Sequence, residues 1–116
     1  MPNAFPFLFI EKIIEYAQRA VAINPDIREM HILLRTAYNR SLQSDKAFHH
    51  TKENLRLEPE NASINFIVGR QYALLANDYV NARIYLNKAC QLDSKQCELT
   101  ARELKEMEQR EKEISR

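Results

Sequence analysis

Two prolines set a period in this chain of 116 residues. Pro25 closes the phrase Ala-Ile-Asn-Pro-Asp, and Pro59, thirty-four residues later, closes Arg-Leu-Glu-Pro-Glu. A third phrase, Gln-Leu-Asp-Ser-Lys at 91–95, follows one residue late with Ser94 in the proline position. An internal period of this length is typical of stacked small units, not of one closed globule. Because stacked units form extended binding surfaces, the period predicts a binding protein.

Apolar residues recur at spacings of three and four in six stretches, which predicts six amphipathic helices. The expected ranges are about 6–23, 27–42, a third helix from 44 or 45 to 57, then 62–76, 79–92 and 95–114. The single glycine argues against tight strand hairpins and phosphate-binding loops. Every connection is short, so consecutive helices should run antiparallel. The predicted fold class is all-α, built from antiparallel helical hairpins.

Polar residues stand at the expected helix starts. Asp26 and Glu29 have the spacing of a capping box, in which each side chain bonds a backbone N–H of the first turn. The other predicted caps are Ser44 or Asp45 for the third helix and Asn61 for the fourth. The pair Asn77–Asp78 is expected to separate the fourth helix from the fifth.

With the prolines aligned, small and aromatic residues recur at matching places. They are Leu34, Tyr38, Ala47 and Pro59 in the first complete copy, and Val68, Gly69, Tyr72, Ala82, Leu86 and Ala89 in the next. This pattern resembles the tetratricopeptide repeat, a helix–turn–helix unit of thirty-four residues. Three positions depart from the family pattern: Arg35, Thr51 and Asn54. We expect them to weaken the packing of that copy or to mark a contact with something else.

The resemblance implies a single domain over 1–116, stacked as a short right-handed superhelix. It divides into a half repeat at 1–27, a repeat at 28–61, a repeat with a one-residue insertion at 62–96, and a capping helix with a charged tail at 97–116. Small residues allow helix axes to approach closely, and the larger ones fill the gaps between them. The mixed charges of the last helix suit the polar cap that a stack needs.

In this family the first helix of each repeat lines a concave groove. The resemblance therefore implies a partner-binding surface made of Ile32, Thr36, Asn39, Arg40, Phe66, Arg70, Ala73 and Leu74. Apolar side chains beside two arginines suit an amphipathic peptide or helix of a partner protein that carries acidic groups. An alternative is that the chain's own ends cover these apolar residues.

The incomplete first unit offers a second hypothesis, a self-associating scaffold. The apolar residues at the start of the chain would then pair with another copy and give a homo-oligomer. The candidate residues are Phe5, Phe7, Leu8 and Phe9.

The same sequence argues against several other functions. A net charge of +1 gives no general attraction to nucleic acid or to an anionic membrane. His49 and His50 are adjacent on a helix and cannot chelate one ion, and His31 lies on another helix, so we expect no metal site. No nucleophile–base arrangement is recognisable. We therefore expect no cofactor and no enzymatic activity.

Cys90 and Cys97 are the only cysteines. We expect two free thiols in a reducing compartment, which makes a cytoplasmic location the default. The alternative is a disulfide that joins one helix to the next. The opening residues lack a basic leader and are too few to span a bilayer.

Overall fold

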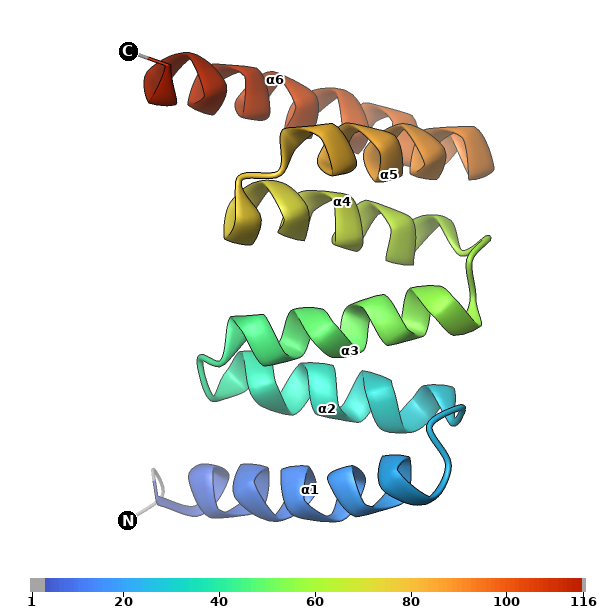
Figure 1. Ribbon diagram of the computed structural model, residues 1–116, viewed down its shortest axis with the longest axis vertical. Coiled ribbons are helices and arrows are strands. Elements are labelled where there is room, and N and C mark those ends of the chain that lie inside the picture. The colour runs from blue at the N-terminus through green and yellow to red at the C-terminus, as the bar shows by residue number, and fades with distance from the viewer. Residues whose placement is uncertain (1–3, 116) are drawn as a thin grey trace. The chain divides into compact units, whose positions relative to one another are not determined.

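The computed structural model describes the backbone of residues 4–115 and the side chains of residues 9–115. This part of the chain is helical and contains no strand, which confirms the predicted all-α fold (Figure 1). The elements are α1 (Ala4–Ile23), α2 (Arg28–Arg40), α3 (Ser44–Leu57), α4 (Ala62–Ala76), α5 (Tyr79–Leu92), the short 3₁₀ helix η1 (Ser94–Gln96) and α6 (Cys97–Ile114). The predicted ranges match these helices to within a few residues.

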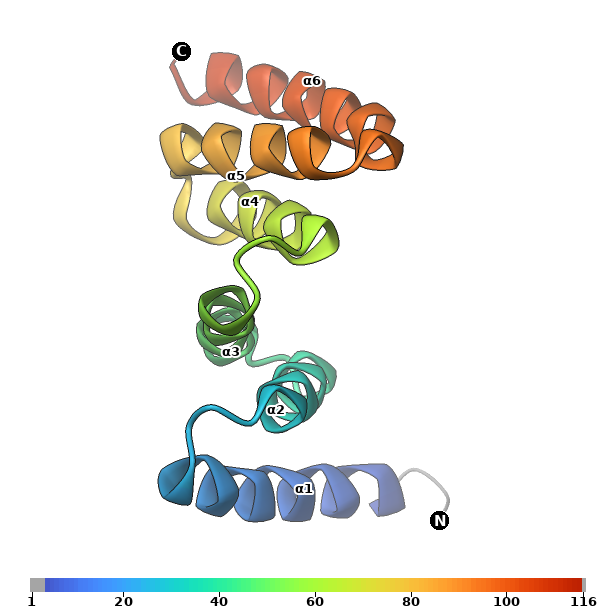
Figure 2. The same cartoon turned by 90° about the vertical axis from the view of Figure 1, so that its right-hand side faces the viewer.

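The chain forms two compact units, Met1–Leu57 and Glu58–Arg116, called unit 1 and unit 2 below. In unit 1, α2 packs against both α1 and α3. Consecutive helices run in opposite directions (Figure 1), and in Figure 2, where α2 and α3 are seen nearly end-on, α1 crosses them at an angle. Its buried apolar core comprises Ala17, Leu34, Tyr38 and Ala47, with Ile14, Val21 and Met30 packed at the edge.

In unit 2, α5 packs against both α4 and α6, and α4 also touches α6. Its core comprises Ala73, Ala82, Leu86 and Met107, with Phe66, Tyr72, Tyr79 and Leu104 around it. Arg83 on α5 forms an ion pair with Glu111 on α6. Helix α6 thus packs on one face of the preceding hairpin.

At Gly69, the backbone of α4 lies close to that of α5. A Cβ atom at this position would lie 2.9 Å from the backbone nitrogen of Leu86 and 3.0 Å from the carbonyl oxygen of Ala82. Backbone atoms cannot move aside as a flexible side chain can, so only glycine allows this separation. The expectation that small residues bring the helices together is therefore confirmed here.

Two of the departures from the repeat pattern are buried and hydrogen-bonded. Asn54 Nδ2 on α3 donates to the carbonyl oxygen of Arg28 on α2, at 3.1 Å. Thr51 Oγ1 donates to the carbonyl oxygen of Ala47 in its own helix, at 3.0 Å. Asn54 therefore adds a bond between α2 and α3 where we expected weakened packing.

The helix starts agree only in part with the predicted caps. The side chain of Asn61 accepts a hydrogen bond from the Ile64 N–H at 3.0 Å, as predicted. At the predicted break between α4 and α5, the side chain of Asp78 caps α5 by accepting from the Asn81 N–H at 3.1 Å, which was not predicted. The capping box at Asp26 is wrong, because Ile27 is the N-cap of α2 and makes no side-chain cap bond. Arg56 Nη2 on α3 instead donates to Asp26 Oδ1 at 2.8 Å. This long-range partner competes for the carboxylate.

Helix α2 ends in a Schellman motif with an unusual residue in it. The N–H of Gln43 donates to Tyr38 O and that of Leu42 to Asn39 O, which leaves Leu42 at φ 60°. Glycine normally occupies this left-handed position, because a Cβ is strained there. The Leu42 side chain is 90% exposed, so its packing contributes little to offset the strain.

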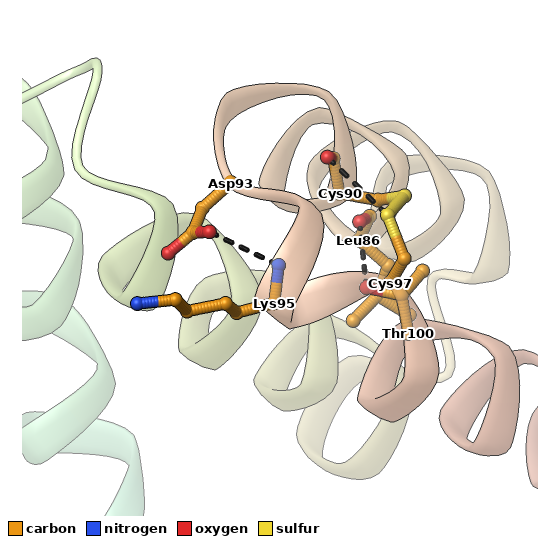
Figure 3. Close-up of a disulfide and its surroundings, with 6 residues drawn as sticks. All are labelled: Leu86, Cys90, Asp93, Lys95, Cys97 and Thr100. Carbon is orange, nitrogen blue, oxygen red and sulfur yellow. Dashed lines mark hydrogen bonds between the residues drawn. A yellow bond between two sulfur atoms is a disulfide. The ribbon is translucent and has the colours of Figure 1, made fainter.

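The prediction of free thiols is wrong, because Cys90 and Cys97 form a disulfide (Figure 3). Asp93 caps η1 by accepting from the Lys95 N–H at 3.0 Å, and this turn brings the two Cα atoms to 4.4 Å. Thr100 Oγ1 donates to Leu86 O beside the bridge. Because disulfides are typical of oxidising compartments, the cytoplasmic prediction loses the thiols as its support.

Among the described residues, no helix has the length and apolar character needed to cross a membrane.

Candidate functional site

The predicted binding residues of unit 1 lie along α2. Ile32 is half-buried, whereas Thr36, Asn39 and Arg40 are exposed. Thr36 Oγ1 donates to Ile32 O at 2.9 Å, so its hydroxyl is partly used within the helix. The neighbouring Leu33 is also exposed. This surface of α2 therefore offers polar groups beside limited apolar area.

The predicted binding residues of unit 2 lie along α4, and they separate into two kinds. Ala73 is only 1% exposed and packs in the core, and Phe66 packs at the edge of that core. Leu74 is 50% exposed, and Arg70 is exposed with its Nε 3.9 Å from Glu103 Oε1 on α6. Arg70 and Leu74 are thus the residues here that a partner can reach, and Ala73 is not.

The residues proposed for self-association lie at the start of α1. The side chains of Phe5, Phe7 and Leu8 are outside the described residues, while Phe9 is 64% exposed. Tyr16 and Ile23 follow Phe9 at intervals of seven and are exposed as well. Residues seven apart lie on one side of a helix, so α1 carries an apolar stripe that α2 does not cover.

Sequence reasoning missed a buried pair of histidines in unit 1. His31 on α2 is 2% exposed and His50 on α3 is 5% exposed, and their Nδ1 atoms lie 2.9 Å apart. His31 Nε2 lies 2.6 Å from the carbonyl oxygen of Pro25. No local pattern links residues that are nineteen apart on different helices. The predicted pairing of α2 with α3 was the one signal that could have placed them together.

The hydrogen bonds of the pair define the tautomers of both rings. A carbonyl oxygen only accepts, so His31 Nε2 must carry a hydrogen and donate to Pro25 O. In a neutral His31, Nδ1 is then the acceptor, and His50 Nδ1 is the donor. It follows that Nε2 of neutral His50 carries a lone pair. Among the described residues this atom has no hydrogen-bond partner.

The surroundings of His50 favour the neutral ring. Burial, followed by the neighbouring His49 and His31, lowers the pKa of His50 from 6.5 to about 4, against a smaller opposing effect of Glu53. The Glu53 carboxylate accepts from Arg56 Nε at 2.8 Å, and this bond lowers the pKa of Glu53. The nearby acid is therefore already paired, so it balances little of a charge on His50.

A hollow of about 220 Å³ lies next to this pair within unit 1. Its lining residues are Gln18 from α1, Tyr38 from α2, and Lys46, His49 and His50 from α3. Gln18 Nε2 donates to the hydroxyl oxygen of Tyr38 at 2.6 Å, and the ring of Tyr38 stacks on that of His50. The described lining of the hollow therefore has several hydrogen-bonding groups and no acidic one.

The described residues contain no group of three histidine, cysteine, aspartate or glutamate side chains that could hold a metal ion. His31 and His50 use their facing nitrogens on one another and so do not form a chelate.

Comparison of the sequence with protein-family models gives no match, and comparison with curated proteins gives none either.

Proposed function

We propose that this chain is a tetratricopeptide-like repeat module that binds a peptide or helix of a partner protein and performs no catalysis. The binding surfaces are the exposed sides of α2 and α4, the first helices of the two hairpins α2–α3 and α4–α5. The partner is amphipathic and carries acidic groups, which Arg40 and Arg70 can bind.

The observation that carries the proposal is the exposed pair Arg70 and Leu74 on α4. The two residues are one helical turn apart, so an apolar side chain and a guanidinium stand together on one surface. The contact of Arg70 with Glu103 is long at 3.9 Å, and the Arg70 side chain is 52% exposed, so its guanidinium can also reach a partner carboxylate. Exposed apolar groups beside such a charge are typical of helix-binding surfaces.

The test is the double variant Arg70→Glu and Leu74→Ser. Both side chains are exposed, so we expect unchanged helical content and loss of the partner captured by the wild-type protein. The captured partner is then purified and its affinity for both proteins is measured directly. Phe66 is avoided because its substitution would disturb the core of unit 2.

The matched control is the double variant Val80→Ser and Ile84→Ser on α5. These residues are as exposed as Leu74 but lie on the second helix of the hairpin. We expect the control to bind normally. Equal affinity of the Arg70/Leu74 variant and the wild-type protein would refute the assignment to α4.

The stripe on α1 supports a second candidate function, a scaffold that pairs with another copy of itself. Its exposed members Phe9, Tyr16 and Ile23 repeat at intervals of seven, as apolar residues do in helix–helix seams. The flanking Lys12 and Arg19 both pair with Glu15, at 3.7 and 3.0 Å, which offsets repulsion between copies.

Light scattering over a concentration series separates the two functions. A scaffold gives a mass that rises with concentration in the wild-type protein and stays at one chain in the variant Tyr16→Glu. A monomeric mass for the wild-type protein at the highest concentration would exclude the self-associating function.

A further inference from the structure

The hollow in unit 1 has the groups that would hold an anion. Lys46 brings an ammonium group that lies 5.7 Å from the centre of the Tyr38 ring and forms no ion pair with a described carboxylate. The hydroxyl of Tyr38 accepts from Gln18 Nε2, which leaves its own hydrogen to be donated elsewhere. Two donors, one of them charged, therefore border a space in which no described side chain is acidic.

His50 adds a third group, Nε2, which becomes a hydrogen-bond donor only when the ring is protonated. Its Nδ1 hydrogen is engaged by His31, so Nε2 is the nitrogen left to meet a ligand in the hollow. Protonation at Nε2 leaves the bond between His50 and His31 intact, because that bond uses only Nδ1 of each ring. Nε2 can thus change from acceptor to donor without disturbing the contact of α2 with α3.

The charges around His50 show what a ligand must supply. His31 faces the ring from α2, and Lys46, His49 and Glu53 belong to its own helix. Among the described side chains of α1, the uncharged Gln18 lines the hollow. Glu53 is bound by Arg56, which also pairs with Asp26. Glu53, the carboxylate that acts on His50, is therefore already paired, and an anion in the hollow would balance a proton on His50.

We propose that this hollow binds a small carboxylate, held by Lys46 and Tyr38, and that His50 takes up a proton on Nε2 as the carboxylate binds. The two carboxylate oxygens can accept from all three donors. The proton comes from solvent and is released there again when the ligand leaves. The carboxylate is that of a free small acid or of a glutamate side chain of another protein. The site is independent of the surfaces proposed on α2 and α4.

Carboxylate binding and protonation of His50 are linked equilibria, so each can be measured through the other. Because the carboxylate favours protonated His50, binding raises the pKa of His50, and a fall in pH strengthens binding by the same factor. The direction is specific, since an anion bound away from His50 would leave its titration unchanged.

The experiment follows the ring C–H resonances of the three histidines by NMR as pH is lowered, in formate and in chloride at equal ionic strength. We expect a saturable formate-dependent shift at His50 and a higher pKa for His50 in formate. A peptide with one glutamate, compared with its glutamine counterpart, forms the second arm. A glutamate-dependent shift assigns the site to a protein side chain, and a shift with formate alone assigns it to a free acid.

Lys46→Gln and Lys52→Gln are the matched variants. Both lysines are exposed on α3 and lie over aromatic rings, but only Lys46 borders the hollow. We expect Lys46→Gln to weaken formate binding about fivefold, and Lys52→Gln to leave it unchanged. Identical His50 titrations in formate and chloride, or equal effects of the two substitutions, would overturn the proposal.

Discussion

In unit 1 the contact between α2 and α3 contains two imidazoles and an asparagine amide, whereas Gly69, Ala82 and Leu86 make the contact between α4 and α5 in unit 2. Hydrogen bonds between buried polar groups depend on the protonation of each partner. Close apolar contacts depend on shape alone. The two hairpins therefore differ in what can destabilise them. Protonation affects unit 1, whereas changes of side-chain volume or of covalent linkage affect unit 2.

The largest expected effect concerns the covalent link in unit 2. The disulfide closes a loop between residues that are seven apart, so it lowers the entropy of the unfolded chain. Replacing both Cys90 and Cys97 by serine should reduce the free energy of unfolding of unit 2 by about 2–3 kcal/mol. Urea denaturation of the variant and of the wild-type protein, each with and without reductant, measures the loss. A reductant effect in the variant equal to that in the wild type would contradict the assignment to this bond.

A change of volume in unit 2 is the next test. Gly69→Ala places a Cβ against the backbone of α5, so α4 and α5 must separate. We expect the free energy of unfolding to fall by about 2 kcal/mol. Ala76→Gly, at an exposed position near the end of α4, is a control for helix propensity and should cost less than about 1 kcal/mol. Unchanged stability in Gly69→Ala would mean that the two helices are not in close contact.

Acid should weaken unit 1. The pKa of His50 is about 4 in the folded protein against an ordinary 6.5, so the unfolded chain binds the proton first. The resulting stability is present above pH 6.5 and is lost as pH falls from 6.5 toward 4, by about 1–2 kcal/mol. Denaturation at several pH values in this range measures the slope. His50→Gln removes this titration, so a slope that persists in the variant would assign the acid sensitivity to other groups.

The smallest effect is a gain, in the loop between α2 and α3. Leu42→Gly relieves the left-handed strain at φ 60° and removes an exposed side chain with little packing to lose. Part of the benefit is offset by the greater freedom of glycine in the unfolded chain. We expect unit 1 to gain about 0.5–1 kcal/mol, measured by the shift of its denaturation midpoint. A loss of stability would show that Leu42 contributes packing in solution.

Much of the fold could be predicted because its signals are local. The spacing of apolar residues predicts the helices, Asn61 caps the next residues in sequence, and Gly69 is the one residue without a Cβ. The missed features depend on how one helix is aligned along its neighbour, which the sequence pattern of a single helix does not reveal. Asp26 meets Arg56, thirty residues later, and His31 meets His50 only once α2 and α3 are aligned. The disulfide depends on the turn at η1, which the helical pattern does not specify.

Of the predicted binding residues, the sequence places Arg70 and Leu74 on an accessible side of α4 but does not reveal that Ala73 faces the core. Residues one apart on a helix point in directions about 100° apart, and their burial is decided by the helices that pack around them. The hollow beside His50 could not be predicted, because the described residues that line it come from three helices.

Native-state hydrogen exchange, read residue by residue, tests the contrast between the units most directly. It is measured in four samples: at neutral pH and near pH 5, each with and without reductant, with the intrinsic exchange rates corrected for pH. We predict that acid lowers the protection of α2 and α3 but not of α4 and α5, and that reductant lowers the protection of α5 and α6 but not of α2 and α3. Equal losses in both units under either condition would contradict the account.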